Sequence, residues 1–210
     1  MASHITSSPL DRNESRRYTV CVPTPSFRSG NGATWLDFLS TLAGRYRPQQ
    51  QDSIASPQAL AAWFTSVDRR PAGAITDTDV TDARRLREAL HSAALAVMHR
   101  RAPSRGDLAV LNAALAFDHP PEISRRPTGI ALEPPADTAA VLAGLARDAL
   151  VTLTGPDRDR LHTCGDDSCS GIFLDATGRR RWCTDERCGN RLRVQAHRAR
   201  AKAAGDTRRA

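Results

Sequence analysis

Apolar residues recur at helical spacing through most of the segment from residue 31 to residue 155. Residues 33–46 place three leucines and an alanine on one face of a predicted helix. A second helix is predicted to begin at Ser56-Pro57, because serine caps a helix and proline suits its first turn. Three further helices are predicted over residues 76–101, 104–117 and 137–153.

Two stretches depart from this helical pattern. Residues 120–135 are rich in proline, and two apolar runs there, at Ile123 and residues 130–132, are predicted to pair as a short hairpin. Residues 1–30 are rich in Ser, Arg, Pro and Gly without periodicity, so we expect a flexible leader containing at most one short strand, at residues 18–22.

The pattern therefore predicts a mainly α fold with a helical domain over residues 31–155. Only 5% of residues are aromatic, so the core must consist largely of Leu, Val and Ala, which favours packed helices. Trp35, Trp63 and Phe64 could line a ligand pocket, but their apolar helical positions favour core packing.

The chemistry of the chain is concentrated in residues 164–190, where four cysteines form two pairs. Four residues separate the members of each pair, and the ligands are predicted to be Cys164, Cys169, Cys183 and Cys188. Zn²⁺ prefers four tetrahedral ligands, and four thiolates leave no position for water, so one structural zinc ion per chain is predicted. The alternatives are disulfides or free thiols, or substitution of one ligand by His162 or His197.

The residues around the cysteines predict a treble-clef-like zinc finger over residues 160–204, followed by a tail over residues 205–210. Residues 172–174 are predicted to form a hairpin with Arg181-Trp182 across a turn at residues 175–178. A helix is predicted to follow Cys188, over residues 192–202.

Positive charge is gathered in the same module. The chain has a formal net charge of +7, and its C-terminal part from residue 158 onwards holds thirteen basic and seven acidic residues. A local basic patch favours a polyanionic partner, most often nucleic acid. The residues predicted to contact double-stranded DNA are Arg179, Arg180, Arg181, Arg191, Arg193, Arg198, Arg200 and Lys202.

Other classes of protein are disfavoured. The sequence has no apolar run long enough to span a membrane and no secretory signal pattern, so a cytoplasmic location is expected. In that reducing compartment cysteines more often bind metal than form disulfides. No nucleophile elbow, phosphate loop or pair of carboxylates is recognisable, so the protein is not expected to be an enzyme.

The stretch CSGIFLDATGRRRWCTDERCGNRLRVQAHRAR closely resembles the CGNR zinc finger, which is named after the motif that residues 188–191 form here. Residues 37–43, 86–90 and 111–112 are similar to the helical ABATE domain that usually precedes this finger, with Ser40 where the family usually has Asn. The resemblance implies a bacterial transcription regulator with stress-linked roles.

Two hypotheses of function follow. In the first, the protein is a DNA-binding transcriptional regulator whose finger and basic helix contact DNA, while the helical domain binds a small-molecule effector or forms a homodimer. In the second, the zinc module is a structural clip in an adaptor, and its arginines meet an acidic protein or a structured RNA.

Overall fold

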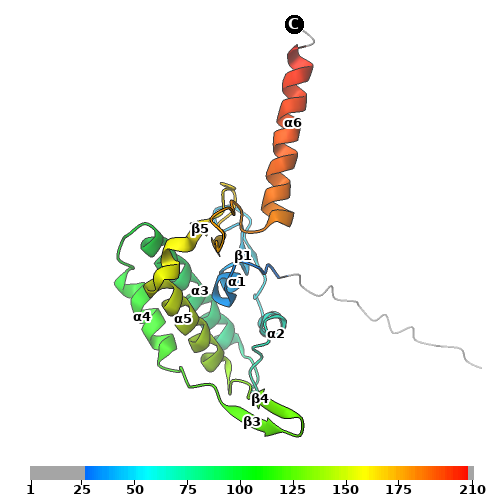
Figure 1. Cartoon of the computed structure of the whole chain (residues 1–210). Coiled ribbons are helices and arrows are strands. Elements are labelled where there is room, and N and C mark those ends of the chain that lie inside the picture. Colours follow the sequence, from blue (N-terminus) through cyan, green and yellow to red (C-terminus); the bar gives the residue numbers. More distant parts are fainter. Residues whose placement is uncertain (1–26, 208–210) are drawn as a thin grey trace, which may run out of the picture.

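The computed structural model describes residues 27–207 and is mainly helical, as the sequence predicts (Figure 1). Its helices are α1 (Thr34–Leu39), α2 (Pro57–Ser66), α3 (Asp77–Met98), α4 (Arg105–Leu115), α5 (Thr138–Thr154) and α6 (Asn190–Thr207), with a 3-10 turn η1 (Pro156–Arg160) and a π turn η2 (Asp185–Gly189). The strands pair in antiparallel twos: β1 (Leu42–Ala43) with β2 (Gln51–Asp52), β3 (Ile123–Arg126) with β4 (Gly129–Leu132), and β5 (Leu161–Thr163) with β6 (Ile172–Leu174). The predicted strand at residues 18–22 lies outside the described residues, as does most of the predicted leader.

Side-chain caps begin four of the helices close to the predicted positions. The hydroxyl of Ser56 accepts a hydrogen bond from the backbone N–H of Ala59 at 3.2 Å and begins α2. Thr76 and Asp79 form a reciprocal capping box at the start of α3. The remaining two caps are Ser104 for α4 and Asp137 for α5.

Helix α1 ends at Leu39, so the helix predicted over residues 33–46 is wrong beyond that residue. The hydroxyl of Thr41 donates to the carbonyl of Phe38 at 2.7 Å, and the chain turns into β1. Gly44 has a φ of 68°, a conformation that glycine adopts without steric cost and that turns the chain back towards β2. Leu42 is buried although it lies in a strand. Its spacing from Leu39 therefore matches that of a helix without a helix being present.

Helices α1, α2, α3 and α5 contribute to the main hydrophobic core. Trp35, Trp63 and Phe64 are at most 1% exposed, which confirms that these aromatic residues pack in the core. The rings of Phe38 and Trp63 lie 5.1 Å apart between centroids. The indole nitrogen of Trp35 donates to the hydroxyl of Thr152 at 3.2 Å, which ties α1 to α5.

A buried ion-pair network fixes the β1–β2 sheet on α3. The guanidinium of Arg87, whose residue is 2% exposed, donates to the two carboxylate oxygens of Asp52 at 2.9 and 3.0 Å. Arg87 also donates to the hydroxyl of Thr41 at 3.0 Å, and Arg84 pairs with Asp52 at 2.9 Å. Burial alone would raise the pKa of Asp52, but the hydrogen bonds from Arg87 outweigh it and hold the pKa below its usual range.

Strand β6 joins the helical domain to the C-terminal module. Ile172 packs in the main core, whereas the next residue, Phe173, is fully buried against the cysteines, as the period-two geometry of a strand requires. The partner of β6 is β5, so the predicted pairing of residues 172–174 with Arg181-Trp182 is wrong.

The carboxylate of Asp175 explains this different pairing. One of its oxygens accepts hydrogen bonds from the backbone N–H and the hydroxyl of Thr177, at 2.8 and 2.9 Å. The other accepts from the backbone N–H of Arg180 at 2.8 Å. These bonds close a compact turn directly after β6, so the following residues do not form a partner strand.

The segment before α1 lies against β6. The backbone N–H of Leu174 donates to the carbonyl of Asn31 at 2.8 Å. The side-chain amide of Asn31 donates in turn to Asp37 at 2.8 Å and to Ser40 at 3.0 Å. A Cβ added at Gly32, where φ is 95°, would lie 2.8 Å from the Cβ of Leu174, so only glycine permits this close approach.

Helix α6 packs against η2 at its beginning and then extends away from the helical bundle, while the β3–β4 hairpin lies at the opposite end of the molecule (Figure 1). Residues 193–200 are all exposed. Among the described residues, no helix is both long and apolar enough to cross a bilayer.

We expect Asp52→Asn to lower the free energy of unfolding by about 3 kcal/mol, because it leaves the charge of Arg87 buried without its main counter-charge. The control is Glu133→Gln, which breaks the exposed pair with Arg126 and should cost less than about 1 kcal/mol. Chemical denaturation measures the free energy of unfolding of both variants. Equal decreases in the two would contradict the structural role of the buried pair.

Candidate metal centre

The four predicted ligands come from two turns that are hydrogen-bonded to each other. Cys164 follows β5, and its backbone N–H donates to the carbonyl of Gly171 at 2.8 Å, which closes the first turn. The backbone N–H of Gly165 donates to the carbonyl of Arg181 at 2.9 Å and so connects the first turn to the second. Cys188 lies in η2, and its N–H donates to the carbonyl of Thr184 at 3.2 Å.

The sulfur atoms of Cys164, Cys169, Cys183 and Cys188 all lie within 4.8 Å of one another. The Sγ of Cys183 is 3.6 Å from the Sγ atoms of both Cys169 and Cys188. A zinc tetrahedron with Zn–S bonds of about 2.3 Å has sulfur–sulfur edges of about 3.8 Å. A disulfide would bring two sulfurs to about 2.05 Å, and all four cysteines are free thiols. The arrangement therefore fits one tetrahedral zinc ion.

Because the four sulfurs lie so close together, the pKa values of their thiols differ widely from one another. Hydrogen bonds from the thiols of Cys164 and Cys183 lower the pKa of Cys169 to about 2. The contact with Cys164 raises the pKa of Cys183, and burial raises that of Cys188 to about 12. Four thiolates in this space therefore need a bound cation to offset their charge, and a thiophilic divalent ion supplies it.

Gly171 leaves space for the sulfur cluster. A Cβ at this position would lie 3.0 Å from the Sγ of Cys183 and 3.3 Å from that of Cys169. Its backbone N–H donates to the Sγ of Cys169 at 3.3 Å. Sequence reasoning missed this glycine, because neither its spacing nor its neighbours reveal a contact with a cysteine 12 residues later.

A buried carboxylate connects the first turn to the start of α6. Asp166 accepts hydrogen bonds from the backbone and hydroxyl of Ser168 and, at 2.7 Å, from the Nε of Arg191. Arg191 also donates to the Sγ of Cys188 at 3.5 Å. Burial opposes ionisation of Asp166, but the bonds from Ser168 and Arg191 keep its pKa below the usual range. This pair orients a metal ligand and fixes the first turn of α6.

Arg180 contacts the zinc module through the ring of Phe173 and the backbone of the second ligand turn. Its guanidinium lies 4.7 Å from the ring centroid of Phe173 and donates to the backbone carbonyls of Trp182 and Cys183. It also donates to the carbonyl of Gly30 at 2.9 Å, which bonds the finger to the segment before α1. Arg180 therefore has a structural position, as Arg191 does.

The helical domain also contacts the ligand turn directly. The Nε2 atom of His91, on α3, lies 3.3 Å from the carbonyl oxygen of Ser170, which follows Cys169. Burial, together with the nearby charge of Arg45, lowers the pKa of His91 to about 4. The ring is therefore neutral at physiological pH and can donate its N–H to this carbonyl.

The other predicted site residues are dispersed over the exposed surface of the module. Arg179 and Arg181 are exposed near the turn after β6, and Arg193, Arg198 and Arg200 are exposed along α6. The side chain of Lys202 lies outside the described part. Among the described residues, neither His162 nor His197 belongs to the sulfur cluster: His162 stacks near Phe173 at 5.9 Å, and His197 is exposed on α6.

We expect Asp166→Asn to weaken zinc binding about 10- to 100-fold, because Arg191 then loses the charge that orients it beside Cys188. The matched control is Asp167→Asn, a neighbouring exposed carboxylate outside this contact, which should leave the affinity unchanged. Competition with a chromogenic chelator measures the zinc affinity of both variants. A wild-type zinc affinity for Asp166→Asn would refute the role of the Asp166–Arg191 pair in orienting the metal ligand.

A family model described as "ABATE: Putative stress-induced transcription regulator" matches residues 32–156, more than half of the chain. The CGNR zinc finger model matches residues 160–201, which include all four clustered cysteines. A search of curated proteins found no match. The chain therefore belongs to the ABATE family and carries a CGNR zinc finger that holds one structural zinc ion.

Proposed function

We propose that the chain is a DNA-binding transcriptional regulator in which the zinc finger holds α6 ready for contact with DNA. The observation that carries the proposal is the exposure of residues 193–200 of α6, a helix that has five basic residues and one acidic residue in its sequence and extends away from the folded body (Figure 1). The exposed part of this helix has no apolar buried face, so it would meet a partner through polar contacts, and the major groove of DNA admits a helix.

The distribution of charge around α6 supports groove binding. The helix has 18 residues, which gives a length of about 27 Å. Arg198 and Arg200 lie on nearly opposite sides, because each residue advances the helix by about 100°. Ala196 and Ala199 lie on one of the two faces between them. Small residues there allow close approach to base edges, while the two arginines reach the phosphates on either side.

The finger itself offers further basic groups beside α6. Arg179, Arg181 and Trp182 line a hollow of about 500 Å³. The guanidinium of Arg181 lies 5.5 Å from the ring centroid of Trp182, which limits its freedom before any ligand binds. Arg180 and Arg191 are left out of the proposed contacts, since both are engaged inside the module.

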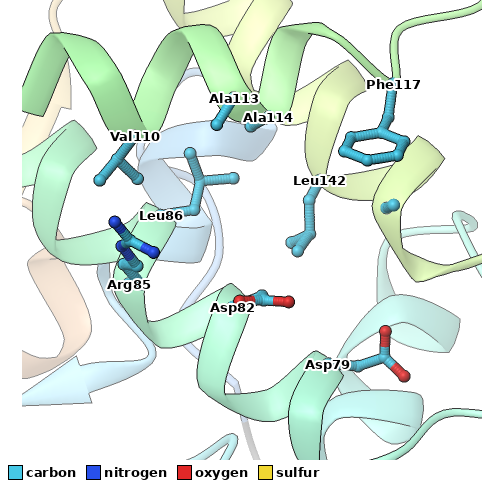
Figure 2. Close-up of a pocket in the computed structure, with 10 residues that line it drawn as sticks. Asp79, Asp82, Arg85, Leu86, Val110, Ala113, Ala114, Phe117 and Leu142 are labelled. Carbon is cyan, nitrogen blue, oxygen red and sulfur yellow. The ribbon is translucent and has the colours of Figure 1, made fainter.

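The helical domain is proposed to sense a small apolar effector, in a pocket of about 170 Å³ (Figure 2). Its apolar lining includes Leu86, Ala114, Leu142 and Phe117. Three charged residues, Asp79, Asp82 and Arg85, line it as well. No residue of α4 is fully buried, and Leu111, Ala114 and Leu115 pack against the core as partly buried residues beside the pocket. The pocket favours effector sensing over homodimer formation as the role of the domain.

The zinc centre supports a regulator rather than an enzyme. Four sulfur ligands complete the tetrahedron, so no position remains at which the metal could activate water. The ion supplies the binding energy that holds the two turns together, and the protein residues supply every contact to the partner. The same proposal places the regulator in the cytoplasm with the DNA that it binds.

Binding to random duplex DNA should weaken steeply as salt rises, because phosphate contacts release counterions. The double variant Arg198→Ala/Arg200→Ala should flatten the slope of log affinity against log salt by about 1.8, which corresponds to two lost contacts. Fluorescence anisotropy at several salt concentrations measures the DNA affinity of the wild-type protein and of the double variant.

The control for this experiment is Arg101→Ala/Arg125→Ala, which removes the same charge from exposed positions on the helical domain. It should leave the slope near the wild-type value. A wild-type protein that shows no salt-dependent affinity for DNA, or that carries RNA through purification and prefers it, would favour the adaptor hypothesis instead.

Benzene is a suitable probe of the effector pocket, because an apolar cavity of about 150 Å³ binds it in another protein. We expect benzene to shift the amide NMR signals of Leu86, Ala114 and Leu142. Ala113→Phe fills the pocket and should abolish these shifts, whereas Ala116→Phe, outside the lining, should retain them. Identical shifts in the two variants would show that the pocket is not the site.

A further inference from the structure

A second cleft lies where the β1–β2 connection meets the first ligand turn of the finger. Its volume is about 230 Å³. Arg28 lines it from the segment before α1, Arg47 and Gln49 line it from the β1–β2 connection, and Cys169 and Arg191 line it from the finger. The cleft therefore exists only because the two parts of the chain are docked together.

The lining of this cleft is basic and polar. It includes three arginines and no carboxylate. Asp166 already pairs with Arg191, but among the described residues no ion-pair or hydrogen-bond partner is found for the guanidinium of Arg28 or Arg47. The amide groups of Gln49 and Gln51 add neutral hydrogen-bond donors. This chemistry matches a phosphate, which accepts several hydrogen bonds and carries negative charge.

The ion-pair network of the neighbouring β1–β2 sheet also has a positive excess. The ion-pair network under the β1–β2 sheet contains Arg45, Arg84 and Arg87, but only two carboxylates, those of Asp52 and Glu88. One positive charge is therefore left without compensation. The Nε and Nη2 atoms of Arg45 are buried without a hydrogen-bond partner, although Glu88 engages its Nη1. An uncompensated guanidinium raises the potential for an anion nearby.

The cleft is continuous with the proposed DNA-binding helix. Arg191 lies in the first turn of α6 and lines the cleft at the same time. We propose that the cleft holds a phosphate of the DNA backbone, with Arg28 and Arg47 as its ligands, while α6 occupies the groove. This inference rests on the proposed function, and it adds the helical domain to the DNA interface.

Two other uses of these arginines have distinct signatures. They could offset the negative charge of the zinc thiolates, in which case their loss would weaken zinc binding. They could also hold free inorganic phosphate without any part in DNA binding. Both alternatives are separated from the proposal by measuring zinc affinity and phosphate binding beside DNA affinity, in the same full-length variants.

The test uses the full chain loaded with zinc and the double variant Arg28→Gln/Arg47→Gln. We expect the slope of log DNA affinity against log salt to flatten by about 0.9, since the cleft holds one phosphate and each neutralised phosphate contributes about 0.9. Affinity at a fixed low salt concentration should fall at least 10-fold. The control Arg101→Gln/Arg125→Gln, with the same loss of charge at exposed sites, should keep the wild-type slope.

The outcomes separate this inference from the proposed function. If the wild-type chain does not bind DNA, the proposed function fails first. If it binds DNA and the double variant keeps the wild-type slope, the cleft proposal is overturned while α6 remains the DNA contact. Weaker zinc binding with an unchanged slope also overturns it, as does saturation by inorganic phosphate that leaves DNA affinity unaltered.

Discussion

Four sulfur atoms within 4.8 Å of one another are the contact on which the C-terminal part of the molecule depends. Their negative charges cannot share this space without a cation, so the zinc ion decides whether the two ligand turns can close. Few apolar residues cover the module, chiefly Phe173 and Trp182, and so small a core cannot hold it together alone. The metal thus replaces the hydrophobic core that the module lacks.

The finger is nevertheless not an independent appendage. Strand β6 places Ile172 in the core of the helical domain and Phe173 against the cysteines, so one strand belongs to two clusters. Asn31 and Gly30 accept hydrogen bonds from the finger, and His91 contacts its ligand turn. These contacts dock the finger, and with it the first turn of α6, on the helical bundle. A change in the bundle therefore has a physical route to the basic helix.

Local signals in the sequence were sufficient for much of this architecture. Helix caps such as Ser56 and the spacing of the cysteines depend on neighbouring residues, so they could be read directly. The end of α1 at Leu39 could not, because Leu42 continues a helical spacing while tertiary contacts direct it into a strand. The partner of β6 was also missed, since the hydrogen bonds of Asp175 close the following turn first.

Basic residues were harder to assign than cysteines. An arginine in a sequence has the same character whether it faces solvent or pairs inside the fold, so Arg180 and Arg191 looked like Arg198. The cleft that contains Arg28 and Arg47 was not foreseeable, because residues more than 100 positions apart form it. Only the docking of the finger on the β1–β2 connection brings them together.

Hydrogen exchange of the full chain, before and after removal of zinc by a chelator, tests the central claim most directly. The account predicts one zinc ion per chain and strong loss of amide protection over residues 161–189 on its removal, with protection of α3 and α5 retained. A protein purified without metal, or protection over residues 161–189 that persists after the ion is removed, would contradict it.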